Sequence, residues 1–510
     1  MGRTGLALFG LACIIAISAY LRFHNLEVNP GWDGDEGYNI NIAWNLSQGR
    51  FQMYALSYTF VQHPPLFFAT LVPVFGVFGA NILALRLLTS FCGVLTTLLL
   101  FFAAKDIAGL RVAVLSSALF AIYPVAVVFN RLGYSYNQLM LFAVLCFYLA
   151  WRFLIKKDER SGPIWAAGAG LAAGLGSITD QEGVFLVAFV VTLVALVRRK
   201  HLPVAVASAL FLPLSYVGMM LATVPGDFVY DLQHNFGRVS GNGPLVESLM
   251  FAFSYERFLD YSYWLPLGIV GLFLLRDRRA KLYTIAFFFL MLLFILKIRN
   301  PNPFFRTAVP VLPFIALGIG LLIDTAIIHL FEWGDEIWRQ TLGSRWLRLQ
   351  SVATTSVVFA LIFLPLAVQT ATDVFGVQTR LRSSIDDFLA DSPRDAVLVA
   401  DFVNSRVRSD DVVIASSNVS WLFRARTADV LQAVVAEGKG TAFYPAVLPK
   451  NRFRYDAAPE AARFVVIDDI SRIWIREMPE ERAIIEMVTS SWRRVYEAGE
   501  YQVFENPSMG

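Results

Sequence analysis

An apolar stretch followed closely by acidic residues decides the fold of this chain: residues 5–21 read GLALFGLACIIAISAYL, and residues 31–38 read GWDGDEGY. A membrane-spanning helix needs about 20 mostly apolar residues. No small-residue cleavage site follows the first stretch, so we interpret it as an uncleaved first span rather than a signal peptide. Asp35 and Glu36 then lie at a membrane surface, where carboxylates persist only if water, a cation or a function holds them. The pair is either a solvated loop or a candidate catalytic site.

Composition defines the broad class of the protein. Hydrophobic residues make up 56% of the chain and charged residues 16%, with 43 Phe and 11 Trp. Soluble domains are rarely so apolar, so we predict an α-helical polytopic membrane protein. The net charge of +3 is too small to indicate a nucleic-acid partner. The three cysteines lie within apolar runs and predict no disulfide framework and no thiolate metal site.

Apolar runs long enough to cross a bilayer recur along the first part of the chain. With the run at 5–21 they predict about eleven membrane-spanning helices, with an upper bound of about thirteen, because several runs are short or contain Gly and Pro. The further runs lie near 81–104, 112–130, 137–155, 163–179, 183–197, 202–222, 261–275, 280–296, 307–323 and 351–370.

The distribution of charge predicts the orientation of these helices. If the N-terminus is cytoplasmic, every inner turn carries Lys or Arg, as the positive-inside rule expects. This orientation requires that residues 66–80, which follow Pro64-Pro65 and contain Pro73, do not cross the membrane but lie in the outer interface. Asp35 and Glu36 then face outward. The basic residues of the inner turns are Lys105, Arg111, Arg152, Lys156, Lys157, Arg160, Arg198, Arg199, Lys200, Arg276, Arg278, Arg279, Lys281, Arg339, Arg345 and Arg348.

The chain changes character after about residue 371. Charged residues become frequent, and the apolar runs shorten to strand length at 411–416, 463–468 and 501–504, with helical stretches around 378–406 and 478–492. We predict two domains: a membrane domain over residues 1–371, with interfacial helices at about 22–80, and an extracytoplasmic α/β domain over residues 372–510. The second contains no glycine-rich phosphate loop, nucleophile elbow or metal-ligand spacing.

Four motifs in order carry a resemblance to a known family. They are the Asp35-Glu36 pair, His63-Pro-Pro-Leu66, Asn81-Ile-Leu-Ala-Leu-Arg86 and Phe305-Arg306-Thr-Ala-Val-Pro-Val-Leu-Pro313. In this order and spacing they resemble the GT-C glycosyltransferases, within the branch of protein O-mannosyltransferases and the aminoarabinose transferase of lipid A. The resemblance covers roughly residues 1–323.

The resemblance implies an integral, multi-pass protein of the cell membrane that acts as an inverting glycosyltransferase. Its donor would be a polyprenyl-phosphate sugar of the dolichyl or undecaprenyl type, and its acceptor a lipid, glycan or protein on the outer face. Such a lipid presents its phosphate at the interface and its sugar outside, so an outer-face cavity needs a carboxylate to deprotonate the acceptor and cations to stabilise the leaving phosphate. By its match to the first acid of the family pair, Asp35 is the candidate base. Glu36 would orient the acceptor or help to bind a divalent cation.

Cationic side chains at outer turns are candidates for binding the donor phosphate. Arg306, Arg299 and Lys297 flank one outer turn that breaks the positive-inside pattern, and a guanidinium matches the geometry of a phosphate. Snorkelling anchors at helix ends are the alternative. Arg131, with Tyr134 and Asn137, is a weaker candidate. Arg86 is either a ligand or a structural partner of a carboxylate.

Three departures from the family pattern leave the donor contacts and the use of a metal open. His63 stands where relatives commonly have Lys, and it is a phosphate ligand, a metal ligand, a proton relay or a capping residue. Asn137 stands where many relatives have Asp. Asp180-Gln-Glu182-Gly183 stands where a Lys-Gly often occurs. A divalent ion such as Mg²⁺, Mn²⁺ or Zn²⁺, held by Asp35, Glu36 and His63, remains an alternative to catalysis without a metal.

Two other classes of function also fit a polytopic chain. A lipid or solute transporter or flippase would carry functional charges inside the membrane, but such proteins commonly show internal repeats, and none is evident here. An inactive relative that only binds lipid is the second alternative. Release of free polyprenyl phosphate from a sugar-linked donor would discriminate among the three.

Overall fold

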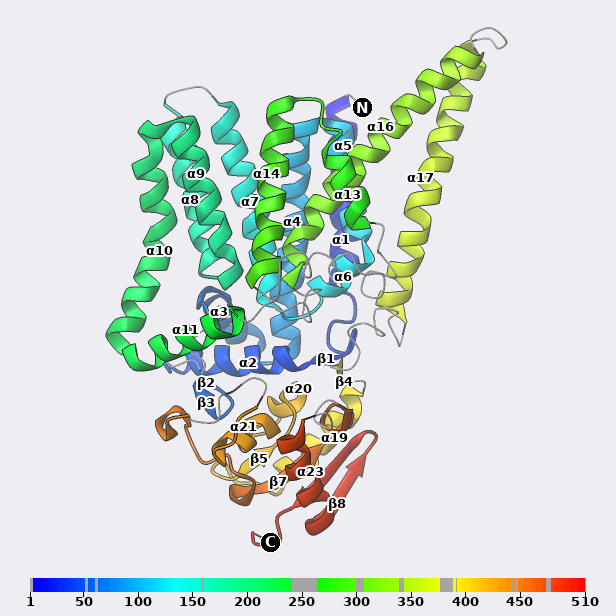
Figure 1. Cartoon of the computed structure of the whole chain (residues 1–510). Coiled ribbons are helices and arrows are strands. Elements are labelled where there is room, and N and C mark those ends of the chain that lie inside the picture. Colours follow the sequence, from blue (N-terminus) through cyan, green and yellow to red (C-terminus); the bar gives the residue numbers. More distant parts are fainter. Residues whose placement is uncertain are drawn as a thin grey trace.

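The computed structural model describes residues 3–50, 54–59, 63–156, 160–240, 264–298, 307–338, 344–376, 389–390, 392–441, 444, 448–473 and 478–509. These residues form a bundle of upright helices with an α/β domain below one of its ends (Figure 1). The N-terminus lies at the far end of the bundle, and the C-terminus lies in the α/β domain.

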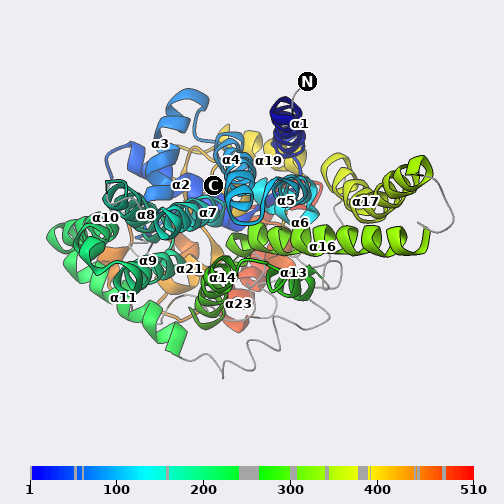
Figure 2. The same cartoon turned by 90° about the horizontal axis from the view of Figure 1, so that it is seen from above.

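The upright bundle contains a helix at each apolar run that the sequence predicts. Seen from above, α10 and α17 lie at opposite sides, and α4, α5 and α7 lie between them (Figure 2). The upright helices are α1 (Arg3–Phe23), α4 (Ile82–Ala108), α5 (Leu110–Ile122) continued by α6 (Pro124–Asn130), α7 (Ser135–Ile155), α8 (Gly162–Ser177), α9 (Val184–Val197), α10 (Leu202–Thr223), α13 (Trp264–Leu272), α14 (Arg278–Ile298), α16 (Leu312–Trp338) and α17 (Ser344–Phe375).

Fewer of these helices meet a strict criterion for crossing a membrane. Within the described residues, 4 helices are long and apolar enough, or up to 5 if the bent pair α5 and α6, which meet at 59°, is one span. Helices such as α8, with 16 residues, and α9, with 14 residues, are shorter than a typical span. A membrane protein with several spanning helices is therefore supported, whereas the count of eleven stays a prediction.

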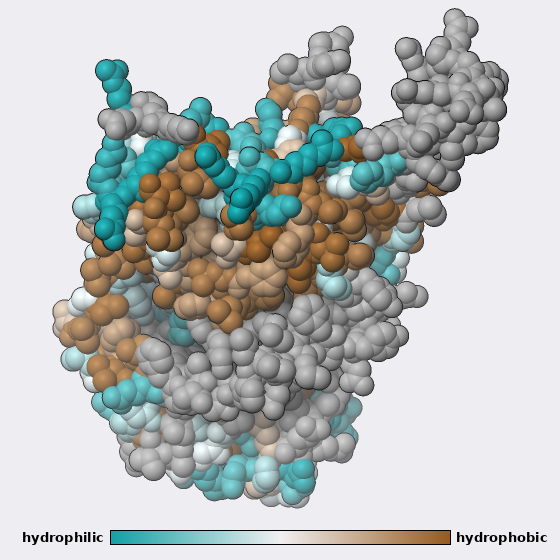
Figure 3. All heavy atoms as spheres, turned by 45° about the horizontal axis from the view of Figure 1, so that its top comes forward, coloured by the Kyte–Doolittle hydropathy of each residue, from teal (hydrophilic) through white to brown (hydrophobic). Residues whose placement is uncertain are grey.

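The two ends of the bundle differ in polarity. On the face shown in Figure 3, polar residues rim the end away from the α/β domain, and an apolar band lies below them. The turns between α4 and α5, between α7 and α8, between α9 and α10, and before α14 all lie at this end. They contain most of the basic residues that the sequence analysis assigns to inner turns.

Three helices lie at the opposite end of the bundle, next to the α/β domain (Figure 1). They are α2 (Gly34–Ser47), α3 (Leu66–Phe78) and α11 (Pro225–Ser240). The N–H of Leu66, at the start of α3, donates to the carbonyl of Ile178, just after α8 (2.9 Å). Arg86, in the first turns of α4, pairs with Glu36 of α2. Both ends of α3 thus lie at one end of the bundle, as expected for a segment that does not cross.

Close helix contacts and aromatic packing hold the bundle together. A Cβ added at Gly318 of α16 would lie 1.9 Å from the carbonyl oxygen of Gly268 in α13, so the two backbones touch. The ring of Phe147 in α7 lies 5.0 Å from the rings of Tyr283 and Phe314. Contacts at this distance are favourable beyond the area that they bury.

Arg22 is a fully buried arginine near the lower end of α1. Its guanidinium donates to the carbonyls of Phe120 and Ala121 at the end of α5 (3.0 and 2.9 Å) and to the side chains of Ser18 and Asn130 (3.0 and 2.9 Å). The last carbonyls of a helix have no partner within that helix and carry partial negative charge. Arg22 therefore stabilises the bend between α5 and α6 through backbone carbonyls and neutral side chains.

The C-terminal part is an α/β domain around a five-stranded sheet of order β6-β5-β7-β9-β8. β5, β6 and β7 are parallel, while β9 is antiparallel to both β7 and β8. The strands are β5 (Val412–Ile414), β6 (Arg426–Ala428), β7 (Ala462–Ile467), β8 (Arg493–Ala498) and β9 (Tyr501–Glu505); the helices are α19 (Pro393–Asn404), α20 (Ser417–Ser420), α21 (Val430–Ala436), α22 (Asp469–Ile473) and α23 (Pro479–Ser491).

Three strands fall where the sequence predicts them, and two do not. The runs at 411–416, 463–468 and 501–504 correspond to β5, β7 and β9. β6 contains only 3 residues, and β8 reads Arg-Arg-Val-Tyr-Glu-Ala, with mostly exposed or half-buried side chains. Neither has the apolar pattern on which strand prediction depends.

The α/β domain contacts the bundle end at several points. The short strand β1 (Trp32–Asp33) pairs with β4 (Leu389–Ala390), and the hairpin β2 (Tyr54–Ala55) and β3 (Tyr58–Thr59) lies against residues near Phe453. Arg452, only 1% exposed, forms ion pairs with Asp227 and Asp231 of α11 (3.1 and 2.6 Å). The two parts of the molecule are thus joined by backbone pairing and by buried charge.

Candidate active site

The candidate carboxylates lie in the first turn of α2. Asp33 is the N-cap of this helix: its side chain accepts a hydrogen bond from the N–H of Asp35 (2.9 Å), and the side chain of Glu36 accepts from the N–H of Asp33 (3.0 Å). This reciprocal arrangement is a capping box, which satisfies donors at the helix start. The acidic motif therefore starts a helix as well as supplying candidate catalytic groups.

Glu36 is fully buried and accepts four hydrogen bonds. Oε1 accepts from Nε of Arg86 and from the N–H of Gly133 (2.7 Å each), and Oε2 accepts from Arg86 (2.6 Å) and from the N–H of Asp33. Both side chains of the ion pair have 0% exposure. Paired in this way, Glu36 connects α2 to α4.

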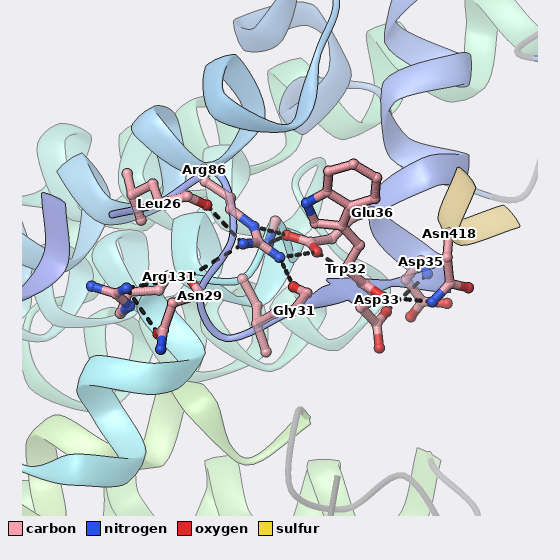
Figure 4. Close-up of polar contacts among 12 residues, drawn as sticks. Leu26, Asn29, Gly31, Trp32, Asp33, Asp35, Glu36, Arg86, Arg131 and Asn418 are labelled. Carbon is pink, nitrogen blue, oxygen red and sulfur yellow. Dashed lines mark hydrogen bonds and ion pairs between the residues drawn. The ribbon is translucent and has the colours of Figure 1, made fainter. Parts of the chain in front are cut away.

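Arg86 and Arg131 together hold the loop that leads into α2 (Figure 4). Arg86 donates to the carbonyls of Leu26 (2.8 Å) and Gly31. Arg131 donates to the carbonyl of Leu21 (2.7 Å) and to Oδ1 of Asn29 (2.9 Å). Both arginines are buried, and these contacts direct them to the loop and to the end of α1. Their assignment to a donor phosphate stays a prediction.

The loop has two further features that shape it. Asn29 donates to the carbonyls of Asp373 and Gly376 at the end of α17 (3.1 Å each), and the bond between Asn29 and Pro30 is cis. Gly31 has φ of 120°, a conformation that side chains disfavour. The loop is thus tied to the lower ends of α1, α4 and α17.

Asp35 occupies the exposed side of this first turn. It is half-buried, whereas its neighbour Glu36 is buried. Its N–H is used by the cap, and the residue lies in the first turn of α2. Of the two acids of the motif, Asp35 is the more exposed.

Tyr134 and Asn137 lie behind the site rather than in it. Asn137 accepts a hydrogen bond from Asn130 (2.6 Å) and donates to the carbonyls of Phe129 and Leu132 (2.9 and 3.0 Å), which closes the turn between α6 and α7. Tyr134 is 3% exposed. This turn presents the N–H of Gly133 to Glu36.

The remaining candidates for phosphate binding lie apart or outside the described residues. The carbonyl of His63 accepts a hydrogen bond from Tyr216 of α10 (3.4 Å), and its ring lies against Phe68 at 5.9 Å. Arg299 and Arg306 fall outside the described residues, as does the side chain of Lys297. Their assignment to the donor phosphate stays a prediction.

The candidate metal ligands do not form a site of three protein ligands. Among the described residues, no group of three or more His, Cys, Asp and Glu side chains is placed to hold a metal ion. Glu36 is engaged by Arg86 and by two backbone N–H groups, and a carboxylate so occupied is a poor ligand for a hard cation. The predicted set of Asp35, Glu36 and His63 therefore does not fit a protein-built metal site.

Two residues that organise the site are not apparent from the sequence. Asn29 is one of many loop asparagines, and Asn418 lies 383 positions beyond Asp35 in the chain. Asn418 donates from its amide to the carbonyl of Trp32 (2.5 Å), directly before the cap of α2. Asn418 is part of an Asn-Val-Ser triplet, but neither residue shows a local pattern that indicates this role, because their partners come from distant elements.

Comparisons with known proteins support the fold. Residues 62–224 match the family model described as dolichyl-phosphate-mannose-protein mannosyltransferase. The crystal structure of ArnT from Cupriavidus metallidurans in the apo state is similar, with a TM-score of 0.64 and 15% identity over 100% of this chain and 99% of that one. The same protein bound to undecaprenyl phosphate matches with a TM-score of 0.61 and 14% identity over 99% and 98% of the chains.

The archaeal oligosaccharyltransferase AglB from Archaeoglobus fulgidus is also similar. Its complex with an inhibitory peptide and a dolichol-phosphate matches with a TM-score of 0.56 and 12% identity over 91% of this chain and 71% of that one. A structure of the same enzyme contains Zn and sulfate. No curated protein sequence matches this chain. The chain thus has the fold of the GT-C glycosyltransferases, and the resemblance that the sequence motifs indicate is confirmed.

Proposed function

We propose that this protein is an inverting glycosyltransferase that moves a sugar from a polyprenyl-phosphate donor to a hydroxyl group of a lipid, glycan or protein acceptor. The observation that carries the proposal is the position of Asp35: a half-buried carboxylate on the first turn of α2, at the bundle end that faces the α/β domain. The GT-C fold and the complex of ArnT with undecaprenyl phosphate support the donor class.

The reaction is a single displacement at the anomeric carbon. The acceptor oxygen forms a bond to this carbon while the bond from the carbon to the phosphate oxygen breaks, and the polyprenyl phosphate leaves with the bonding electron pair. The acceptor proton passes to the carboxylate of Asp35. Attack from the face opposite the leaving group inverts the anomeric configuration. A positioned base of this kind typically contributes about 10²- to 10⁴-fold in rate.

Other side chains position Asp35 and stabilise the leaving phosphate. Glu36 and Arg86 position the turn that carries Asp35, so we assign Glu36 a positioning role in place of contact with the acceptor. The cations predicted from the sequence for the leaving phosphate are Arg306, Arg299 and Lys297. A guanidinium there would offset the charge that develops on the phosphate.

The proposal places the reaction on the outer face of the membrane. The turns between helices at the end of the bundle away from Asp35 are rich in Lys and Arg, which favours a cytoplasmic location for that end. The site and the α/β domain would then face the periplasm, cell exterior or organelle lumen. Donor phosphates at a lipid interface are accessible there.

The experiment compares Asp35→Asn with Glu27→Gln in purified protein. Glu27 is an exposed carboxylate of the same loop, so its amide is a matched control. With a polyprenyl-phosphate sugar and an acceptor pool, we expect Asp35→Asn to lose about 10²-fold or more in release of polyprenyl phosphate, and Glu27→Gln to behave as wild type. Retention of about half of the wild-type turnover by Asp35→Asn would remove Asp35 from the role of base. Lack of any release by wild type across donor sugars would remove the proposed function.

A further inference from the structure

We propose that the α/β domain completes the active site and that Asn418 is a positioning residue for Asp35. The inference rests on the proposed function, because it assigns to a second domain part of the machinery that orients the base. Asn418 does not touch the substrate. It acts through the backbone of residues 32–34, which begins the helix that carries Asp35.

The topology of the domain delivers Asn418 to this place. β5 is the central strand of three parallel ones, and α20 begins 3 residues after it, at Ser417. The carboxyl ends of parallel strands, with the helix starts that follow them, are where α/β sheets present functional groups. Here the carboxyl ends of the parallel strands face α2, since α20 packs on α2 and on β1.

A buried hydrogen bond connects the two domains at the critical turn. The amide Nδ2 of Asn418, a side chain that is only 3% exposed, donates to the carbonyl of Trp32 (2.5 Å). This carbonyl directly precedes Asp33, the N-cap of α2. The ring of Trp32 also lies edge-on to that of Trp421, at 5.2 Å and 62°. Loss of the donor would leave a buried carbonyl without this partner, which is unfavourable.

Two glycines of α2 show how closely α20 lies on the turn. A Cβ at Gly37 would lie 1.7 Å from the carbonyl oxygen of Ser417, and a Cβ at Gly34 would lie 2.8 Å from Oγ of Ser417 and 3.2 Å from Oδ1 of Asn418. Real Cβ atoms do not approach a backbone oxygen to 1.7 Å, so only glycine fits at position 37, while a side chain at position 34 would require Ser417 and Asn418 to shift. The backbone on both sides of Asp35 is therefore in direct contact with α20.

Asp35 is consequently held from two domains. Glu36, its neighbour on one side, is clamped by Arg86 of the bundle, and Gly34, its neighbour on the other, lies on Asn418 and Ser417 of the α/β domain. Figure 4 shows Asn418 beside Trp32, Asp33 and Asp35. A shift of about 1 Å in a catalytic group can cost roughly 10²-fold in rate. The α/β domain thus determines where the base sits.

The kinetic experiment uses three variants of the full chain. Asn418→Ala removes the amide, and Asn418→Asp also adds a negative charge beside Asp33 and Asp35. Asn506→Asp is the matched control. Asn506 directly follows β9, is 4% exposed and donates to the carbonyls of Glu460 and Ala462 within the same domain. We expect both Asn418 variants to lose about ten- to a hundredfold in kcat, with the donor KM within about twofold of wild type.

The pH profile separates positioning from general loss of structure. Asn418→Asp should move the acidic limb of the kcat profile to higher pH, because a second carboxylate next to Asp35 favours its protonated form. Asn418→Ala should lower kcat without moving that limb. Wild-type kcat in Asn418→Ala, or an equal loss of kcat in Asn506→Asp, would overturn the proposal.

Hydrogen–deuterium exchange gives a readout that does not depend on activity. In Asn418→Ala, the amides of residues 32–38 should exchange at least about tenfold faster than in wild type, as expected when a local contact worth about 1.4 kcal/mol or more is lost. Asn506→Asp should leave this segment unchanged. Wild-type exchange at 32–38 in Asn418→Ala would refute the positioning contact. If wild type transfers no sugar, the proposed function fails, while the exchange result still decides whether Asn418 holds the turn.

Discussion

At the scale of single residues, two adjacent acids have different environments and therefore different expected roles. Asp35 is half-buried at a helix start, whereas Glu36 is buried and paired with Arg86. The family resemblance assigns the role of base to Asp35 and a role in binding the acceptor or a cation to Glu36. The burial of Glu36 among four donors supports a different role for it, that of a residue that holds the helix in place.

Substitution of Glu36 should therefore affect stability more than chemistry. We expect Glu36→Gln to lower the stability of the protein by about 3–5 kcal/mol, because the amide leaves the buried guanidinium of Arg86 without its charge partner. Asp35→Asn, by contrast, should unfold at nearly the wild-type temperature. Thermal unfolding in detergent measures both.

A double substitution provides the control for this expectation. In Glu36→Gln with Arg86→Met neither charge of this pair remains, so the two changes together should cost less than the sum of the two single ones. Simple additivity would show that Glu36 and Arg86 do not stabilise each other.

A second residue-scale prediction concerns pH and the contact between the domains. Burial raises the pKa of Asp429 from 3.8 to about 7, with the N–H groups of Gln432 and Leu431 opposing this and Glu481 adding to it. Its carboxylate accepts a hydrogen bond from Tyr38 of α2. Between these two pKa values the folded state binds more protons than the unfolded state, so this group makes stability fall as the pH rises from about 4 to about 7.

Asp429→Asn should remove this dependence. The unfolding temperature at pH 8 minus that at pH 5 should be more positive in Asp429→Asn than in wild type. Asp410→Asn, an exposed change in the same domain, should follow wild type. Parallel pH dependence in wild type and Asp429→Asn would contradict an elevated pKa for Asp429.

At the scale of elements, several helices owe their positions to glycine contacts that hydropathy does not reveal. α13 has 9 residues and lies against α16, where Gly268, Gly271 and Gly318 bring the two backbones together. The sequence predicts that both segments are apolar. It does not predict which of the other helices each one touches.

This packing can be tested with a matched pair of glycine substitutions. Gly318→Ala should destabilise the protein by about 1–3 kcal/mol, because the new methyl group overlaps the backbone of Gly268. Gly218→Ala, in α10, meets nothing within 4 Å and should be neutral or slightly stabilising, since Ala favours helix over Gly by about 1 kcal/mol. Equal unfolding temperatures for the two variants would argue against the close contact of α13 with α16.

At the scale of the whole molecule, the distribution of charge predicts one orientation for the chain. The turn at residues 198–201 lies at the end of the bundle opposite to α2 and the α/β domain. A protein that follows the positive-inside rule would keep this turn in the cytoplasm. Residues in α2 and in the α/β domain would then be outside.

Cysteine labelling checks this orientation in intact cells. In a background with Cys13, Cys92 and Cys146 replaced, an impermeant maleimide should label Gln48→Cys and Ser490→Cys, both exposed sites near or in the α/β domain. Lys200→Cys, also exposed, should be labelled only after permeabilisation. The reverse pattern would invert the molecule. Labelling of Gln48→Cys on the side opposite to Ser490→Cys would require a different number of crossings between the two residues.

The sequence by itself determined the class of the protein, the helical segments, the change of character before the α/β domain and the resemblance to GT-C enzymes. These features depend on local composition, periodicity and short motifs, which a linear chain displays directly. Pro64-Pro65, Pro73 and the distribution of charge also predict that α3 does not cross the membrane, and this stays a prediction. The burial of Glu36 did not follow from the motif, because burial is not a local property.

Only the tertiary structure decided which polar residues build the site. Arg86 reaches Glu36 across 50 positions, Arg131 reaches Asn29 across 102, and Asn418 reaches Trp32 across 386. The sequence marks Arg86 and Arg131 as candidates and offers a carboxylate as a partner of Arg86, but no spacing identifies Glu36, Asn29 or Trp32 as the partners. Each becomes specific only when the packing of distant elements leaves a buried carbonyl or carboxylate that needs a partner, since an unsatisfied buried group is costly.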